Sequence, residues 1–120
     1  MKIAITATGQ DLSAQVDPRF GRAAYILVVD TDTLDFDVID NAANRNAFKG
    51  AGIQAAAAVS DKGAQVLLTG YCGPNAFKTL EAAGVKVVND VSGTIQEAVD
   101  RFNTGAYAAY ASAPNTDGHW

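Results

Sequence analysis

The chain has 120 residues, 48% of them hydrophobic and 18% charged, a composition that is ordinary for one globular domain and excludes a disordered or collagen-like chain. Its net charge of −4 and isoelectric point of about 4.7 give no overall attraction for nucleic acid or an anionic membrane surface. No apolar run approaches the roughly 20 residues that span a bilayer, and no signal-peptide pattern precedes the first predicted strand, so we expect a cytoplasmic protein.

The first half of the sequence predicts three strands. Residues 2–7 alternate between two faces, and residues 23–29 are apolar on both faces, as in a central strand. Residues 36–39 form a short third strand, and the turn over 30–35 makes the second and third strands an antiparallel hairpin. Polar segments over 8–21 and 41–49 flank this hairpin.

The second half alternates helices with strands. The first predicted helix covers 50–62, is lined by small residues and ends at Gly63, and a strand over 66–69 follows it. The next helix has Phe77, Leu80 and Ala83 on one face and ends at Gly84, before a strand over 85–88. The last helix begins at a Thr94–Glu97 capping box and ends at Gly105. Residues 1–105 therefore make one domain, and residues 106–120 make a loosely held tail.

This order of elements predicts an α/β fold. Helical crossovers impose parallel strands with right-handed connections, whereas the hairpin is antiparallel. The simplest arrangement is a mixed five-stranded sheet in the order 3-2-1-4-5 with helices on its faces. This is a three-layer, ribonuclease-H-like arrangement.

The loops that carry most arginines meet at one edge of this predicted sheet. The carboxyl ends of the first, fourth and fifth strands define this carboxyl edge, which receives the segments 8–22, 41–50, 70–74 and 89–93. It collects four of the nine cations, namely Arg19, Arg22, Arg45 and Lys49. Two helices also begin there, near Gly50 and Pro74, and helix N-termini favour anions. We therefore predict an anion site, although Asp11, Asp17, Asp40 and Asp90 share the edge and the arginines could instead be solvated or paired with them.

Several common motifs are excluded. The GxGxxA pattern over 50–55 follows a polar loop rather than a strand, so its glycines fit a helix start better than a dinucleotide site. A ribonuclease-H-like nuclease needs a carboxylate on its first strand, and residues 2–7 have none. One cysteine, Cys72, and one histidine, His119, cannot form a four-ligand zinc or iron–sulfur site within one chain. A helix dipole could lower the pKa of Cys72, although we expect a buried, inert thiol.

Five segments resemble a known family in order along the chain. They are residues 16–23 (VDPRFGRA), 38–41 (VIDN), 50–56 (GAGIQAA), 69–77 (TGYCGPNAF) and 82–87 (AAGVKV). Together they resemble the dinitrogenase iron–molybdenum cofactor biosynthesis family over about residues 1–105. The resemblance implies a ribonuclease-H-like fold and a non-enzymatic carrier that stores, inserts or transfers a preassembled anionic metal–sulfide cluster, with a donor or recipient protein as a possible partner.

Within the family, the short chain and its alanine-rich first helix most resemble members that carry a molybdenum–copper sulfide cluster without ordinary protein–metal ligation. An iron–molybdenum cofactor precursor is the alternative ligand, and histidine ligation finds no match because His119 lies outside the resembling region. Guanidinium and backbone N–H groups would hold the sulfides. The predicted binding residues are Arg19, Phe20, Gly21, Arg22, Asn44, Arg45, Lys49, Gly50, Gly52, Gly70, Tyr71, Cys72, Gly73 and Asn75.

Other interpretations stay open at this point. Phe20 and Phe77 fit the core as well as a ligand-covering surface, and the glycines fit turns as well as close approach to sulfides. The chain could also be a regulatory or protein-interaction module of the same fold without tight cluster binding. A small enzyme that uses Cys72 or a carboxylate at the carboxyl edge is the weakest of these alternatives.

Overall fold

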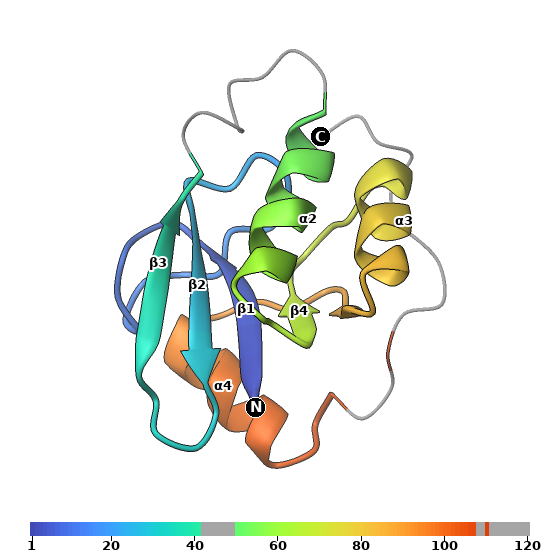
Figure 1. Ribbon diagram of the computed structural model, residues 1–120. Helices are drawn as coiled ribbons and strands as arrows, with labels where there is room; N and C mark the ends of the chain where they lie inside the picture. The colour runs from blue at the N-terminus through green and yellow to red at the C-terminus, as the bar shows by residue number, and fades with distance from the viewer. Residues whose placement is uncertain (42–49, 108–109, 111–120) are drawn as a thin grey trace.

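The structure is a computed structural model that describes residues 1–41, 50–107 and 110 (Figure 1). Its elements in chain order are β1 (Lys2–Ala7), β2 (Tyr25–Asp30), β3 (Phe36–Asp40), α2 (Ala51–Asp61), β4 (Val66–Leu68), α3 (Pro74–Ala82), β5 (Lys86–Val88) and α4 (Ile95–Asn103). Every strand and helix that the sequence predicts is present, with ends that differ by a few residues. No helix in the described ranges is both long and apolar enough to cross a membrane.

The five strands form one mixed sheet in the order β3-β2-β1-β4-β5, which confirms the predicted order 3-2-1-4-5. The strands β1, β2 and β3 pair antiparallel, whereas β4 and β5 run parallel to β1. The ends of β1, β4 and β5 therefore meet at the carboxyl edge, as the sequence predicts. The start of β2 differs from the prediction by two residues, since the strand begins at Tyr25 rather than at residue 23. The carbonyls of Ala23 and Ala24 instead accept hydrogen bonds from the side chain and the backbone N–H of Asn41.

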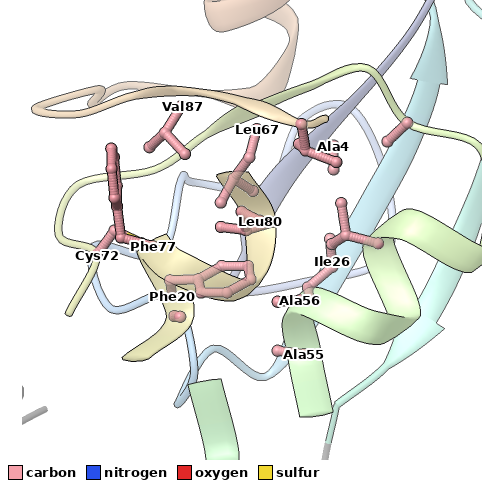
Figure 2. Close-up of a cluster of buried hydrophobic side chains, with 14 of the residues drawn as sticks. Ala4, Phe20, Ile26, Ala55, Ala56, Leu67, Cys72, Phe77, Leu80 and Val87 are labelled. Atoms are coloured by element: carbon pink, nitrogen blue, oxygen red, sulfur yellow. The ribbon is translucent and has the colours of Figure 1, made fainter. Parts of the chain in front are cut away.

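Helices cover both faces of the sheet, so the predicted three layers are present (Figure 1). On one face α2 and α3 pack on a buried cluster in which the small side chains of Ala55 and Ala56 let α2 approach the strands closely (Figure 2). On the other face Ile95, Ala98 and Val99 of α4 pack on Ile3 and on its neighbours in the sheet. The core is therefore two clusters separated by the sheet.

The helix ends follow the predicted chemistry. Thr94 and Glu97 make a complete capping box at the start of α4, because each side chain accepts a hydrogen bond from the backbone N–H of the other residue. Pro74 is the first residue of α3. Gly63 follows α2 with a φ of 79°, a left-handed conformation that side chains with a Cβ disfavour.

The segment 8–22 differs from the plain polar loop that the sequence predicts. Val16 forms a β-bridge with Ala7, and Gln15 forms one with Thr94. Leu12 packs against the same core cluster as α4. Residues 8–16 are thus attached to the start of α4, and residues 17–22 remain as the part that lies beside the turn 70–73. The predicted tail lies mostly outside the described residues, in which only 106, 107 and 110 represent it.

Candidate functional site

Two loops at the carboxyl edge are joined by backbone hydrogen bonds. The N–H of Tyr71 donates to the carbonyl of Pro18 at 2.6 Å, and the N–H of Phe20 donates to the carbonyl of Tyr71 at 3.1 Å. These bonds make a parallel bridge between Arg19 and Tyr71. A Cβ at Gly70 would lie 2.8 Å from the backbone of Pro18, so glycine is required at this contact. The segments 17–21 and 70–73 therefore form one local unit, as the predicted sheet order requires.

The same unit touches the first turns of two helices. A Cβ at Gly21 would lie 2.7 Å from the backbone nitrogen of Gly52 in α2, and a Cβ at Gly52 would lie 2.9 Å from the Cβ of Ala76 in α3. Distances below 3.0 Å leave no room for a side chain. We call residues 17–22, 50–52 and 70–76 the junction, since backbone or Cβ atoms of these three segments are in direct contact.

Both helices that begin in the junction have glycine as their N-cap residue. The N-cap residues Gly50 and Gly73 provide no side-chain cap, and neither α2 nor α3 has an acidic residue in its first turn. In contrast, α4 has a capping box and Glu97 in its first turn. Such helix starts present N–H donors and the positive end of the helix dipole, so this arrangement favours an anion.

The described cations of the junction are Arg19 and Arg22. The side chain of Arg19 is 40% exposed, and its Nε lies 3.9 Å from Oδ1 of Asp17, whose side chain is only 8% exposed. Arg22 is half-buried. Three further predicted binding residues, Asn44, Arg45 and Lys49, lie outside the described residues.

Sequence reasoning missed a buried polar network beneath the junction. The hydroxyl of Thr6 donates to the carbonyl of Asp17 at 2.6 Å and lies 2.9 Å from the hydroxyl of Thr69, at the end of β4. On the other side the amide nitrogen of Asn41 donates to the carbonyls of Gly21 and Ala23, at 3.2 and 2.8 Å. These hydrogen bonds anchor both ends of the segment 17–23. A threonine that follows the apolar residues 3–5 of β1 was the available indication in the sequence.

Two predicted binding residues have side chains inside the core. Phe20 is 1% exposed and Cys72 is fully buried, and both belong to the cluster beneath α2 and α3, together with Phe77 (Figure 2). The core interpretation of Phe20 and Phe77 is therefore confirmed. Burial raises the pKa of the Cys72 thiol to about 12, so the alternative of a helix-lowered pKa was wrong. The backbone N–H of Phe20 bonds to Tyr71 in the junction, and the thiol of Cys72 lies 3.8 Å from the carbonyl of Gly73, so both residues contact the junction from the core side.

Of the remaining predicted residues, Gly70 is buried and the others are exposed or half-buried. Tyr71 is 37% exposed and Asn75 is exposed, whereas Gly50, Gly52 and Gly73 are half-buried. No group of three or more His, Cys, Asp or Glu side chains that could hold a metal ion occurs within residues 1–41 and 50–107. In these ranges the junction offers cations and N–H donors instead of metal ligands, which suits an anion that brings its own metal coordination.

Comparison with known proteins agrees with this architecture. The chain is similar to the apo form of the orange protein from Desulfovibrio gigas, with 49% identity, a TM-score of 0.92 and 96% of each chain covered. It is also similar to a candidate NifB protein from Thermotoga, with 38% identity, a TM-score of 0.72 and coverage of 87% of this chain and 88% of that one. An uncharacterised protein of Methanocaldococcus jannaschii is 27% identical over 108 residues, which are 88% of this chain and 87% of that protein. A model of the dinitrogenase iron–molybdenum cofactor family matches residues 1–105, so the chain belongs to that family.

Proposed function

We propose that this chain is a non-enzymatic carrier that binds, stores or transfers an anionic, molybdenum-containing metal–sulfide cluster at the junction. A molybdenum–copper sulfide cluster is the favoured cargo, in line with the similarity to the orange protein, and an iron–molybdenum cofactor precursor is the second choice. We expect it to act in the cytoplasm and to exchange the cluster with a donor or recipient protein.

The observation that carries this proposal is the pair of helix starts with glycine N-caps beside Arg19. The first turns of α2 and α3 touch through Gly52 and Ala76, neither turn holds an acidic residue, and the described residues provide neither helix with a side-chain cap. Their N–H groups and the guanidinium of Arg19 can donate to sulfides from the same side of the fold. Arg22, Arg45 and Lys49 would add positive charge, which an acidic chain needs locally to attract an anion.

The residues available support a noncovalent mode of binding. A thiomolybdate-type cluster supplies its own sulfides to its metals, so the protein has to compensate charge and exclude water rather than provide ligands. Charge-assisted hydrogen bonds from arginine are suited to that task. Tyr71, which is partly exposed beside Arg19, would provide an apolar surface at the border of the site.

Reconstitution tests the proposal. Cluster-free protein titrated anaerobically with tetrathiomolybdate and copper(I) should gain protein-bound charge-transfer bands in the visible, with molybdenum and copper in the desalted fraction. Zinc alone should bind poorly, because a closed zinc site needs about four N, S or O ligands. Tight zinc binding without a protein-bound chromophore from thiomolybdate and copper would contradict the proposal.

A protein-interaction module is the second candidate, and one observation favours it. Ile53 and Tyr71, which belong to or adjoin the junction, are 43% and 37% exposed. Exposed apolar side chains beside a cationic loop are typical of a docking surface. A folded wild-type protein that takes up no cluster would leave this candidate ahead.

A further inference from the structure

Asp17 has a buried carboxylate that lies beside the exposed guanidinium of Arg19. Its Oδ1 accepts a hydrogen bond from the backbone N–H of Arg19 at 3.1 Å, and the Nε of the same arginine lies 3.9 Å from the same oxygen. The Asp17 side chain is 8% exposed, and burial of a carboxylate is unfavourable unless charge and hydrogen bonds compensate it. Arg19 supplies both contacts.

The backbone of Asp17 is fixed to the sheet. Its N–H donates to the carbonyl of Thr6 at 2.9 Å, and its carbonyl accepts from the hydroxyl of the same threonine at 2.6 Å. That hydroxyl lies 2.9 Å from the hydroxyl of Thr69, so the contact links β1 to the end of β4. The carboxylate is therefore attached to a rigid base, whereas an arginine side chain has many rotamers of its own.

We propose that Asp17 is a positioning residue that holds the guanidinium of Arg19 at the junction, ready for the anion. The inference rests on the proposed function, because Arg19 is the group that would contact the cluster. A guanidinium that is already ordered loses less rotamer entropy when a ligand binds. In this role Asp17 increases the affinity for the anion. A carboxylate that acted only through its charge would decrease that affinity, because it repels an anion.

The direction in which one substitution changes the affinity for the cluster distinguishes these two roles. Asp17→Asn keeps the shape and an oxygen acceptor for the N–H of Arg19 but removes the charge that pairs with Nε. We expect it to weaken the binding of tetrathiomolybdate with copper(I) about two- to fivefold. Asp90→Asn is the matched control, because it removes the same charge from an exposed residue whose N–H bonds to Gly70. It should not weaken binding.

A double variant shows whether Asp17 acts through Arg19. In an Arg19→Ala background, Asp17→Asn should cause no further weakening, and melting curves should verify that all variants are folded. Tighter binding by Asp17→Asn, or equal weakening in both backgrounds, would overturn the proposal.

A second measurement does not depend on the cluster. In cluster-free protein, ¹⁵N relaxation should report an ordered Nε–H group for Arg19 that becomes mobile in Asp17→Asn, while the Nε–H of Arg101 stays unchanged. Equal mobility of Arg19 in both proteins would refute the positioning role. If the wild-type protein binds no cluster, the proposed function fails, and the relaxation data still decide what Asp17 does.

Discussion

Arg19 combines exposure with a fixed place in the junction, so its removal should affect ligand uptake more than folding. Arg19→Ala should weaken cluster binding about tenfold or more, since a charge-assisted hydrogen bond contributes about 1.5–3 kcal/mol. The free energy of unfolding should fall by about 1 kcal/mol, because the guanidinium is exposed and 3.9 Å from the buried carboxylate, and the backbone N–H of residue 19 still donates to that carboxylate. Cluster titrations and melting curves measure the two quantities.

Arg101→Ala is the control for this variant. Arg101 lies on α4, on the opposite face of the sheet, where it pairs with Glu97 at 3.8 Å and donates to the carbonyl of Ser92. Its loss should leave cluster affinity unchanged. Binding to wild-type protein should also weaken with added salt, since charges at the surface are screened over about 8 Å at physiological ionic strength. Equal affinity of the two variants would exclude Arg19 from the site.

Cys72 should behave as a protected core thiol. Burial raises its pKa from 9.0 to about 12, so the neutral thiol stabilises the folded state below pH 9, and this contribution is lost as the pH rises towards 12. At about pH 8, iodoacetamide should alkylate native Cys72 more than about a hundredfold more slowly than the urea-unfolded chain. A fast reaction of the native protein would show that the thiol is accessible.

Cys72→Ala tests the same residue as a metal ligand. The variant should lose about 1 kcal/mol of stability, because it leaves a small cavity in the core cluster, and it should keep most of its cluster binding. Loss of the chromophore in the folded variant would make Cys72 a ligand.

At the scale of single residues, the sequence predicted which segments meet but not how they are fixed. The pattern VDPRFGRA predicts a loop of the candidate site, and the expected meeting of this loop with the turn after β4 is confirmed by the bridge between Arg19 and Tyr71. The buried pairing of Thr6 with Thr69 was not predictable, because hydroxyl groups 63 residues apart meet only after β1 and β4 have paired in register. The burial of Phe20 was not predictable either, because an aromatic side chain in a loop is buried only if other segments of the fold pack over it.

The capping box of α4 is the clearest local stabilising device among the helices. Thr94→Ala should lower the free energy of unfolding by about 1 kcal/mol, as is typical for a lost N-cap. Thr104→Ala is the matched control at the other end of α4, where the hydroxyl donates to the carbonyl of Arg101, which also accepts a hydrogen bond from the N–H of Ala106. Thr104→Ala should lower the free energy of unfolding clearly less than Thr94→Ala does, as measured by urea unfolding of both variants.

The same box makes α4 sensitive to acid. The hydrogen bond from the backbone N–H of Thr94 keeps the pKa of Glu97 below its ordinary value of 4.5. The Glu97 carboxylate therefore stabilises the folded state above pH 4.5, and this contribution is lost as the pH falls through the lower pKa of the folded state. The difference in unfolding free energy between wild type and Glu97→Gln should shrink over this acidic range. A constant difference would mean that the carboxylate charge contributes nothing.

The elements themselves were the most predictable part of the molecule. Each one has a local cause in the sequence, such as the alternation in β1, the small residues of α2 or the capping box of α4. The attachment of residues 8–16 to α4 was missed, because its contacts are backbone bridges such as Gln15 with Thr94. Backbone pairing between irregular segments leaves little trace in side-chain patterns.

At the scale of the whole molecule, the two core clusters should make the fold independent of its ligand. Large side chains such as Ile5, Leu67 and Leu80 are fully buried in these two clusters by other protein side chains. Cluster-free protein should therefore unfold in one cooperative transition, and a chelator should not shift its melting temperature. A bound cluster should add about 2.7 kcal/mol when its free concentration is one hundred times its Kd. Unfolding by a chelator would contradict this prediction.

The central position of β1 has a consequence for how the chain can be divided. Ile3 pairs with Val29 on one edge of β1 and with Val66 on the other. A fragment that stops in the polar segment after β3 can form the antiparallel meander, but it leaves the second edge of β1 open along fully buried, aliphatic residues. Open apolar edges promote pairing between chains. The border between the antiparallel and parallel halves, although evident in the order of the elements, is therefore not a boundary at which two soluble halves can be separated.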